Sequence, residues 1–335
     1  MSLPDAPGFA PSAARGAALD VTVRAQLADS LRAIAESAED DLCDRGAVAA
    51  LADAVATHPI SSAVMVRYTE AVAAVMQGAA EEAGRCLAAL ADPTLRSPVV
   101  PRVMTLRDAD LGLGGTEAYR RVMDDDPGHS LGMLPLDDAA LPEAAAHVEA
   151  ATALLGEDFA GEIRHLVPEI LGVRGIPGAR LQFDGATSFY LWGCIALNLG
   201  RRRSPIGLAT ALAHESGHAV LFGMTMGGPV VSNPDEERYA SPLREDPRPM
   251  EGIAHATWVL ARMHLAVRGM LDSGKLDAAQ RAEAAQAMQR IARDYQAGHG
   301  VMAQGARFTE AGSAAFAPAE AYMASPGVLG TRLLS

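Results

Sequence analysis

Apolar residues recur at helical spacing along most of the chain. Between residues 18 and 92 they return at intervals of about three to four positions, in segments rich in the strong helix formers Ala, Leu and Glu. The segments "VRAQLADSLRAIAESAEDDL" and "YTEAVAAVMQGAAEEAGRCLAALA" are typical of this pattern. They predict a series of amphipathic helices in the N-terminal part.

The pattern changes between residues 163 and 198. Here "IRHLVPEILGVRG" and "ARLQFDGATSFYLWGCIALNL" contain the β-branched and aromatic residues that are scarce elsewhere in the chain. Such runs are typical of strands. We expect two to four strands in this part, forming one small antiparallel sheet.

A strongly apolar helix is predicted next, in "SPIGLATALAHESGHAVLFGMTM". Ser204 is suited to cap its first turn, and Pro205 fits the first helical position. A loop rich in Pro, Gly and charged residues spans 227–249. Two long helices are then predicted, in "MEGIAHATWVLARMHLAVRGML" and "LDAAQRAEAAQAMQRIARDYQAG".

These patterns predict a mainly α-helical protein with a small β element, an α+β fold. The stretch "MDDDPGHSLGMLPLDDAALPE" is rich in Asp, Pro and Gly, which favours a boundary near residue 130. We therefore predict a helical N-terminal region over residues 1–130 and a second domain over residues 131–335. A chain of 335 residues is long enough for two domains.

Composition narrows the classes of function. The formal net charge of −13 disfavours nucleic acid as a partner, because phosphate binding needs a basic face. Cys43, Cys86 and Cys194 are widely spaced and form no CxxC motif, which indicates reduced thiols and a cytoplasmic location. The first residues do not resemble a signal peptide, and charges or Gly interrupt every apolar stretch, so we expect no membrane span.

The predicted apolar helix contains the motif H-E-S-G-H, with His214, Glu215 and His218. Positions i and i+4 of a helix share one face, so both imidazoles can bind one metal ion, with the glutamate beside them. An imidazole without a partner is costly in an apolar helix, which favours a metal site over two structural histidines. Residues 131–335 are thus the predicted metal-binding catalytic domain.

The following helix offers two candidates for a third ligand, Glu251 and His255, again four positions apart. With Glu251 as ligand, the site is that of a gluzincin-like zinc peptidase, and Glu215 is the general base. With His255 as ligand, the site consists of three imidazoles, and Glu251 lies outside it or supports a ligand. A closed structural site with a fourth protein ligand is a third, non-catalytic alternative.

The segment around His255 resembles a known family. "SPLREDPRPMEGIAHATW" is similar to the P-x-R-x-D-P-R-P stretch, followed by a helix with a histidine, that is found in the HExxH-motif family of putative peptide-modification proteins. "FDGATSFYLWGCIALNL" is similar to the strand region that precedes the metal helix in that family. The resemblance covers about residues 180–275. Ser216 and Gly217 are smaller than the residues that the family often has there.

The resemblance implies a helical fold unrelated to the jelly roll, and an iron(II)- and 2-oxoglutarate-dependent oxygenase that β-hydroxylates ribosomally synthesised peptides. The implied metal ligands are His214, His218 and His255, and the position of Glu251 is not fixed as an acid. The implied partners are a peptide or peptide-like substrate, 2-oxoglutarate and dioxygen. Imidazole ligands also suit zinc, which can replace iron during purification.

Two arginines are candidates for binding the keto acid. The distal carboxylate of 2-oxoglutarate needs a fixed cation, and Arg244 and Arg248 precede the His255 helix. The alternative for each is a solvated charge or a salt bridge to Glu245 or Asp246. In an oxygenase, Glu215 would orient a ligand or a bound water instead of acting as a general base.

Overall fold

The computed structural model describes residues 8–37, 43–123, 131–176, 183–201, 203–241 and 246–329. The chain divides into two compact units. Unit 1 contains Met1–Arg15, Val148–Glu162 and Arg203–Ser335, and unit 2 contains Gly16–His147 and Ile163–Arg202. This division differs from the predicted single boundary near residue 130, because residues 131–147 and 163–202 cluster with the N-terminal helices.

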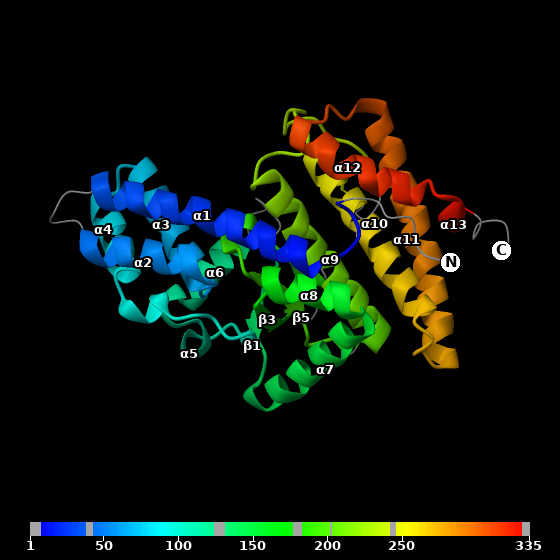
Figure 1. The fold of residues 1–335 in the computed structure, drawn as a ribbon, viewed down its shortest axis with the longest axis horizontal. Helices are drawn as coiled ribbons and strands as arrows, with labels where there is room; N and C mark the ends of the chain where they lie inside the picture. The colour runs from blue at the N-terminus through cyan, green and yellow to red at the C-terminus, as the bar shows by residue number, and fades with distance from the viewer. Residues whose placement is uncertain are drawn as a thin grey trace. The chain divides into compact units, whose positions relative to one another are not determined.

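Helices form most of unit 2, as the apolar periodicity predicts (Figure 1). Asp44 begins the second of them by accepting a hydrogen bond from the amide of Ala47, which is the usual role of an N-cap aspartate. The helical elements are α1 (Ala13–Ser37), α2 (Arg45–Thr57), α3 (Ala63–Met76), α4 (Ala80–Leu90), η1 (Pro93–Arg96), α5 (Asp108–Leu111), η2 (Gly112–Gly114), α6 (Thr116–Met123), η3 (Asp138–Ala140) and η4 (Phe189–Leu191).

Unit 2 also contains one mixed sheet with the strand order β1-β3-β5-β4, and β2 pairs with β3 beside this path. The strands are β1 (Arg102–Thr105), β2 (Leu134–Pro135), β3 (Glu169–Arg174), β4 (Gly185–Ala186) and β5 (Cys194–Asn198). The expected strands between 163 and 198 are confirmed, but the expected antiparallel sheet is wrong. β1, β3 and β5 are parallel, with Ile170 opposite Ile195, and only the short β2 and β4 pair antiparallel.

The physical reason lies in the connection between β3 and β5. Parallel neighbours need a connection of about a dozen residues or more, and the stretch of chain between Arg174 and Cys194 is longer than that. β5 is buried along its whole length and β3 along all but its last residue, as is typical of parallel strands covered on both faces. The local composition predicts strands but does not determine their direction.

A buried carboxylate in unit 2 is fully paired. Glu169 accepts hydrogen bonds from the amide and hydroxyl of Ser62 at 2.8 and 2.6 Å, and from the guanidinium of Arg102 at 2.6 Å. These bonds offset the cost of removing a charge from water. Cys43, Cys86 and Cys194 are free and buried, and burial raises the pKa of the Cys194 thiol well above its ordinary value.

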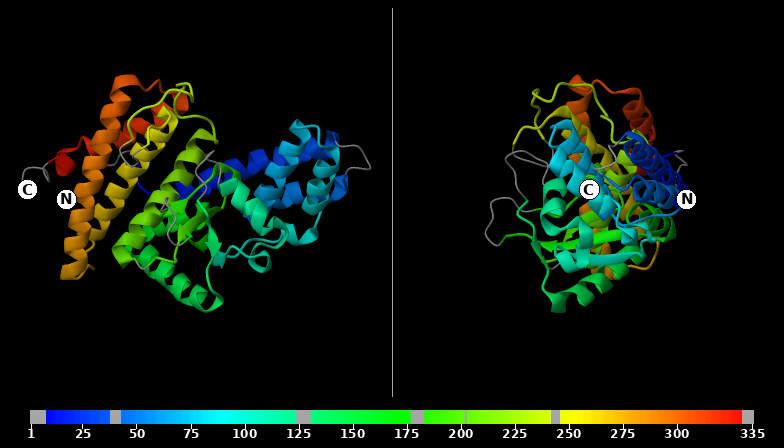
Figure 2. Two further views of the ribbon diagram at one scale, coloured as in Figure 1. Left: turned by 180° about the vertical axis from the view of Figure 1, so that it is seen from behind. Right: turned by 90° about the vertical axis from the view of Figure 1, so that its left-hand side faces the viewer.

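Unit 1 consists mainly of long helices. They are α9 (Pro205–Thr225), α10 (Met250–Asp272), α11 (Ala278–Gly305), α12 (Glu310–Met323) and α13 (Pro326–Leu329), and α7 (Leu141–Leu154) and α8 (Glu157–Leu166) are shared with unit 2. Ser204 caps α9 by accepting from the amide of Gly207, as predicted. α10 lies between α9 and α11, side by side with both (Figures 1 and 2). Among the described residues, no helix combines the length and apolar character that crossing a membrane requires.

A buried ion pair fastens the N-terminal segment within unit 1. The side chains of Arg262 on α10 and Glu162 on α8 are both fully buried and form a salt bridge. Arg262 also donates to the carbonyl of Phe9 at 2.6 Å and lies over the ring of Phe159 at 4.7 Å. Arg15 forms a second salt bridge to Glu162. Each charge therefore has a partner in the apolar interior, which the free energy of burial requires.

Breaking this pair should destabilise the fold strongly. We expect Glu162→Gln to lower the free energy of unfolding by about 3–5 kcal/mol, because the guanidinium of Arg262 stays buried without a counter-charge. The control Asp272→Asn removes the more exposed pair between Arg268 and Asp272 and should cost less than about 1 kcal/mol. Urea unfolding followed by circular dichroism measures both, and a similar small cost for the two variants would contradict this account.

Candidate metal site

Helix α9 is buried over most of its surface and packs closely against α10. Gly217 makes the approach possible, since a Cβ atom there would lie 3.2 Å from Cγ1 of Val259 and 3.7 Å from Cβ of Arg262. The first distance is shorter than ordinary van der Waals contact. The small residue in the motif therefore has a packing role, and it allows the histidines of α9 to lie close to α10.

The imidazoles of His214 and His218 point toward one another. Their Nε2 atoms are 3.2 Å apart, and Oε1 of Glu215 is 4.0 Å from Nε2 of His214. One ligand atom from each of the three residues lies within 4.8 Å of the other two. Two nitrogens that bind one ion at about 2.1 Å each lie about 3 Å apart. The observed spacing therefore fits a shared metal ion.

The tautomer of His214 and the burial of His218 both bear on metal binding. Nδ1 of His214 is 3.2 Å from the sulfur of Met263, a weak acceptor, so a proton on Nδ1 leaves the lone pair on Nε2. Burial, together with the charges of His214 and His255, lowers the pKa of His218 well below its ordinary value. A neutral imidazole needs to lose no proton when a metal binds.

His255 of α10 lies beside this pair but outside the group of three. Its ring stacks on that of His218, with centroids 5.7 Å apart and planes at 19°, and it packs against Phe222 at 5.1 Å. Nε2 of His255 is 3.1 Å from Oε1 of Glu251. The structure thus brings the predicted third imidazole next to the α9 histidines, without placing its nitrogens among their ligand atoms.

The carboxylate of Glu251 is occupied by protein donors. Its two oxygens accept from the amide of Val230 at 2.9 and 3.1 Å, and Oε2 accepts from the amide of Val231 at 3.0 Å. Burial acts to raise the pKa of Glu251, but the hydrogen bonds from His255 and from the two amides outweigh it and lower the pKa. Glu251 is therefore an anion that anchors a loop.

The structure describes only one of the two arginines that are predicted to bind the keto acid. Arg244 lies outside the described residues. Arg248 forms a salt bridge to Asp246 at 3.2 Å, one of the partners expected for it from the sequence. Its backbone pairs with that of Tyr239 in an isolated antiparallel bridge. Its role toward a keto acid stays a prediction.

Two further residues near the site were not predicted from the sequence, although helical spacing could have indicated them. Phe222 is four positions after His218, so it continues the row of His214 and His218 along α9. Met263 is eight positions after His255 and lies on the same side of α10. The amides of Val230 and Val231 belong to a loop, where the sequence carries no comparable signal.

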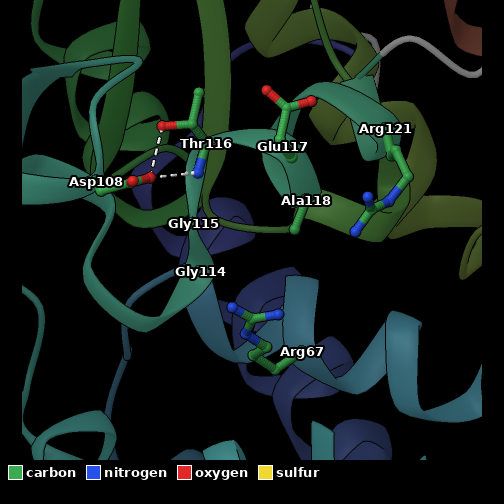
Figure 3. A pocket seen from close by; sticks show the side chains of 8 residues that line it. All are labelled: Arg67, Asp108, Gly114, Gly115, Thr116, Glu117, Ala118 and Arg121. Carbon is green, nitrogen blue, oxygen red and sulfur yellow. Dashed lines mark hydrogen bonds between the residues drawn. The ribbon is translucent and has the colours of Figure 1, made fainter. Parts of the chain in front are cut away.

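A cavity of about 320 Å³ lies elsewhere, in unit 2 (Figure 3). Among its lining residues are Arg67 and Arg121, which both pair with Glu70. Asp108, also in the lining, accepts from the amide and the hydroxyl of Thr116 at 2.8 and 2.7 Å. The charges around this cavity are thus balanced within the protein, and it contains none of the predicted site residues.

The fold and the site define a mainly helical protein with a histidine-rich candidate metal site on two adjacent helices. Imidazole donors suit zinc, iron, copper and nickel better than calcium or magnesium. No protein-family model matches the chain, and no curated protein matches it.

We expect the protein to bind one divalent transition-metal ion per chain. His218→Ala should abolish stoichiometric binding, because it removes one of the two converging nitrogens. His299→Ala is the matched control, since His299 is half exposed and pairs with Glu320. Calorimetric titration with zinc measures this, and at about 100 times Kd the ion should stabilise the protein by about 2.7 kcal/mol. Equal binding by the His218 variant and the wild type would contradict the assignment.

The close packing at Gly217 gives a separate prediction. Gly217→Leu should lower the free energy of unfolding by about 1–3 kcal/mol, because the side chain overpacks the contact with Val259. Zinc affinity should fall as well, since the helices that carry the histidines are forced apart. Gly269→Leu on α10 is the control, because no atom lies within 4 Å of a Cβ there. Full zinc affinity in the Gly217 variant would show that helix spacing does not determine the site.

Proposed function

We propose that this chain is an iron(II)- and 2-oxoglutarate-dependent oxygenase that β-hydroxylates an amino-acid side chain in a ribosomally synthesised peptide during natural-product maturation. The reaction consumes 2-oxoglutarate and dioxygen and gives succinate, carbon dioxide and the hydroxylated side chain. The resemblance of residues 180–275 to the HExxH peptide-modification family supports the cosubstrate and the class of substrate. The geometry of the site supports His214 and His218 as ligands, and it places the ring of His255 beside them.

One observation carries the proposal. The carboxylate of Glu251 is held by two backbone amides and by His255, while the ring of His255 stacks on His218. A carboxylate that already accepts these hydrogen bonds is poorly suited to bind a metal. An imidazole whose other nitrogen donates to a carboxylate is a common arrangement for a metal ligand. This favours three imidazole ligands over the glutamate-containing set.

Each residue then has a defined task. His214, His218 and His255 would hold the ion, and a set of three protein ligands would leave room for 2-oxoglutarate and dioxygen. When bound, the iron supplies the activation of dioxygen. Phe222 packs against His218 and His255 and helps to hold their rings in place. Arg244 and Arg248 are candidates to bind the distal carboxylate of the keto acid, and Glu215 orients a ligand or a bound water.

The second candidate is a gluzincin-like zinc peptidase with Glu215 as the general base and Glu251 as the third ligand. One observation favours it: Glu215 is grouped with His214 and His218, whereas His255 lies outside that group. In this case Glu251 would have to release the amides of Val230 and Val231, or share its oxygens with them, in order to reach a metal. That requirement makes the peptidase the weaker proposal.

We place this activity in the cytoplasm, with a peptide or peptide-like substrate, 2-oxoglutarate and dioxygen as partners. The buried free thiols support a reducing compartment. The net charge of −13 supports a partner other than nucleic acid.

Anaerobic reconstitution tests the proposal. Iron(II) followed by 2-oxoglutarate should produce the weak visible charge-transfer band of a chelated keto acid, which should disappear with formation of succinate when oxygen is admitted. We expect His255→Ala to abolish the band and Glu251→Gln to retain it at saturating iron, because only the histidine is assigned as a ligand.

The peptidase predicts a different result. No band would form, zinc would bind tightly at one ion per chain, and Glu251→Gln would lose that ion while His255→Ala retained it. This pattern would overturn the oxygenase proposal.

A further inference from the structure

We propose that Glu251 is a positioning residue that ties the segment 229–232 to the imidazole of His255, so that the turn between α11 and α12 helps to orient the third metal histidine. The inference rests on the proposed function insofar as His255 is taken as a ligand. It adds a determinant of the site that lies in the α11–α12 turn, which is distant in sequence from the motif.

Glu251 forms the centre of this connection. It is the second residue of α10, where an acidic side chain is favoured by the helix dipole. Its carboxylate accepts from two consecutive amides, those of Val230 and Val231, at 2.9–3.1 Å. Two adjacent donors on one carboxylate fix both the position and the orientation of the segment. Charge-assisted bonds of this kind are stronger than neutral ones.

The segment is in turn fastened to the turn between α11 and α12. The amide of Ser232 donates to the carbonyl of Arg307 at 2.7 Å, and the amide of Thr309 donates to the carbonyl of Val230 at 3.0 Å. Gly312 on α12 allows the close contact, since a Cβ there would lie only 2.0 Å from the carbonyl oxygen of Val230. The segment therefore contacts α10 through Glu251 and the α11–α12 turn through its backbone.

The other end of the connection is the ring of His255. A proton on Nε2, donated to Glu251, leaves the lone pair of His255 on Nδ1 and fixes the rotation of the ring. The ring is further held by stacking on His218 and by contact with Phe222. A shift of the segment would shift the carboxylate and with it the ring. Partners of this kind commonly change metal affinity by about 10–100-fold when they are removed.

The test uses cobalt(II) alone as the probe on the full chain, with amide hydrogen exchange as an independent readout. In Glu251→Ala, exchange at the amides of Val230 and Val231 should accelerate, and cobalt affinity should fall about 10–100-fold while the stoichiometry stays at one ion per chain. In Glu251→Gln, the exchange rates and the cobalt affinity should lie between those of Glu251→Ala and the wild type, because the side-chain carbonyl oxygen can still accept hydrogen bonds.

Glu236→Gln is the matched control. Glu236 is exposed in the same loop, and its side chain forms none of the bonds described between Glu251, the segment and the α11–α12 turn, so the substitution removes an equal charge without touching the connection. We expect this variant to keep the wild-type affinity for cobalt and the wild-type exchange at Val230 and Val231.

Gly312→Ala approaches the connection from the opposite side and leaves the carboxylate intact. The added methyl should displace the carbonyl of Val230, raise exchange at Val230 and Val231 and weaken cobalt binding in the same direction as Glu251→Ala. Gly300→Ala on α11, where no atom lies within 4 Å of a Cβ, is its control. This pair keeps the test decisive if Glu251→Ala does not fold.

The outcomes separate the two proposals. Unchanged exchange at Val230 and Val231 in both Glu251→Ala and Gly312→Ala would overturn the positioning role. Complete loss of cobalt in Glu251→Gln, with normal binding in His255→Ala, would make Glu251 a ligand and overturn the oxygenase as well. Faster exchange in Glu251→Ala, together with normal cobalt affinity in His255→Ala, would show that Glu251 holds the segment without affecting the metal. That result would refute the assigned ligand set.

Discussion

The site depends on the close contact between α9 and α10. Two imidazoles from one helix can share an ion, an open catalytic site needs a third protein ligand, and in the proposed site that ligand comes from the neighbouring helix. The contact of Gly217 with Val259 sets how close the two helices lie. Ser204 and Pro205 fix where α9 begins. Because α9 begins at this point and lies this close to α10, His214 and His218 face the side of α10 that carries Glu251, His255 and Met263.

Two charged groups that determine geometry in unit 1, the guanidinium of Arg262 and the carboxylate of Glu251, are held by protein partners. The pair of Arg262 and Glu162 holds the N-terminal segment, and Glu251 holds the segment 229–232. An ionised group that loses its partner inside a protein strongly destabilises the fold. These contacts therefore constrain the structure more than their net stabilisation suggests. The same reasoning separates the two candidate enzymes: a peptidase would use the carboxylate that anchors the loop, and an oxygenase would use the imidazole beside it.

Helix positions and the α9 histidine pair could be predicted from the sequence, because caps and i, i+4 spacing are local properties. Ser204, Pro205, His214 and His218 all lie where that spacing predicts. The direction of β3 and β5 could not be predicted, since it depends on the crossover between them. The sequence could not choose between Glu251 and His255, because both face the same way. What distinguishes them is the bonding of Glu251 to the amides of Val230 and Val231 and the stacking of His255 on His218, which are contacts between distant parts of the chain.

In the proposed site, α10 contributes an imidazole and not a carboxylate to the metal. A crystal structure of the metal-loaded protein, with the ion located by anomalous scattering, is the decisive measurement. We predict that nitrogen atoms of His214, His218 and His255 bind the ion, while the carboxylate of Glu251 stays on the amides of Val230 and Val231. A carboxylate oxygen of Glu251 bound to the ion, with His255 apart from it, would contradict this assignment.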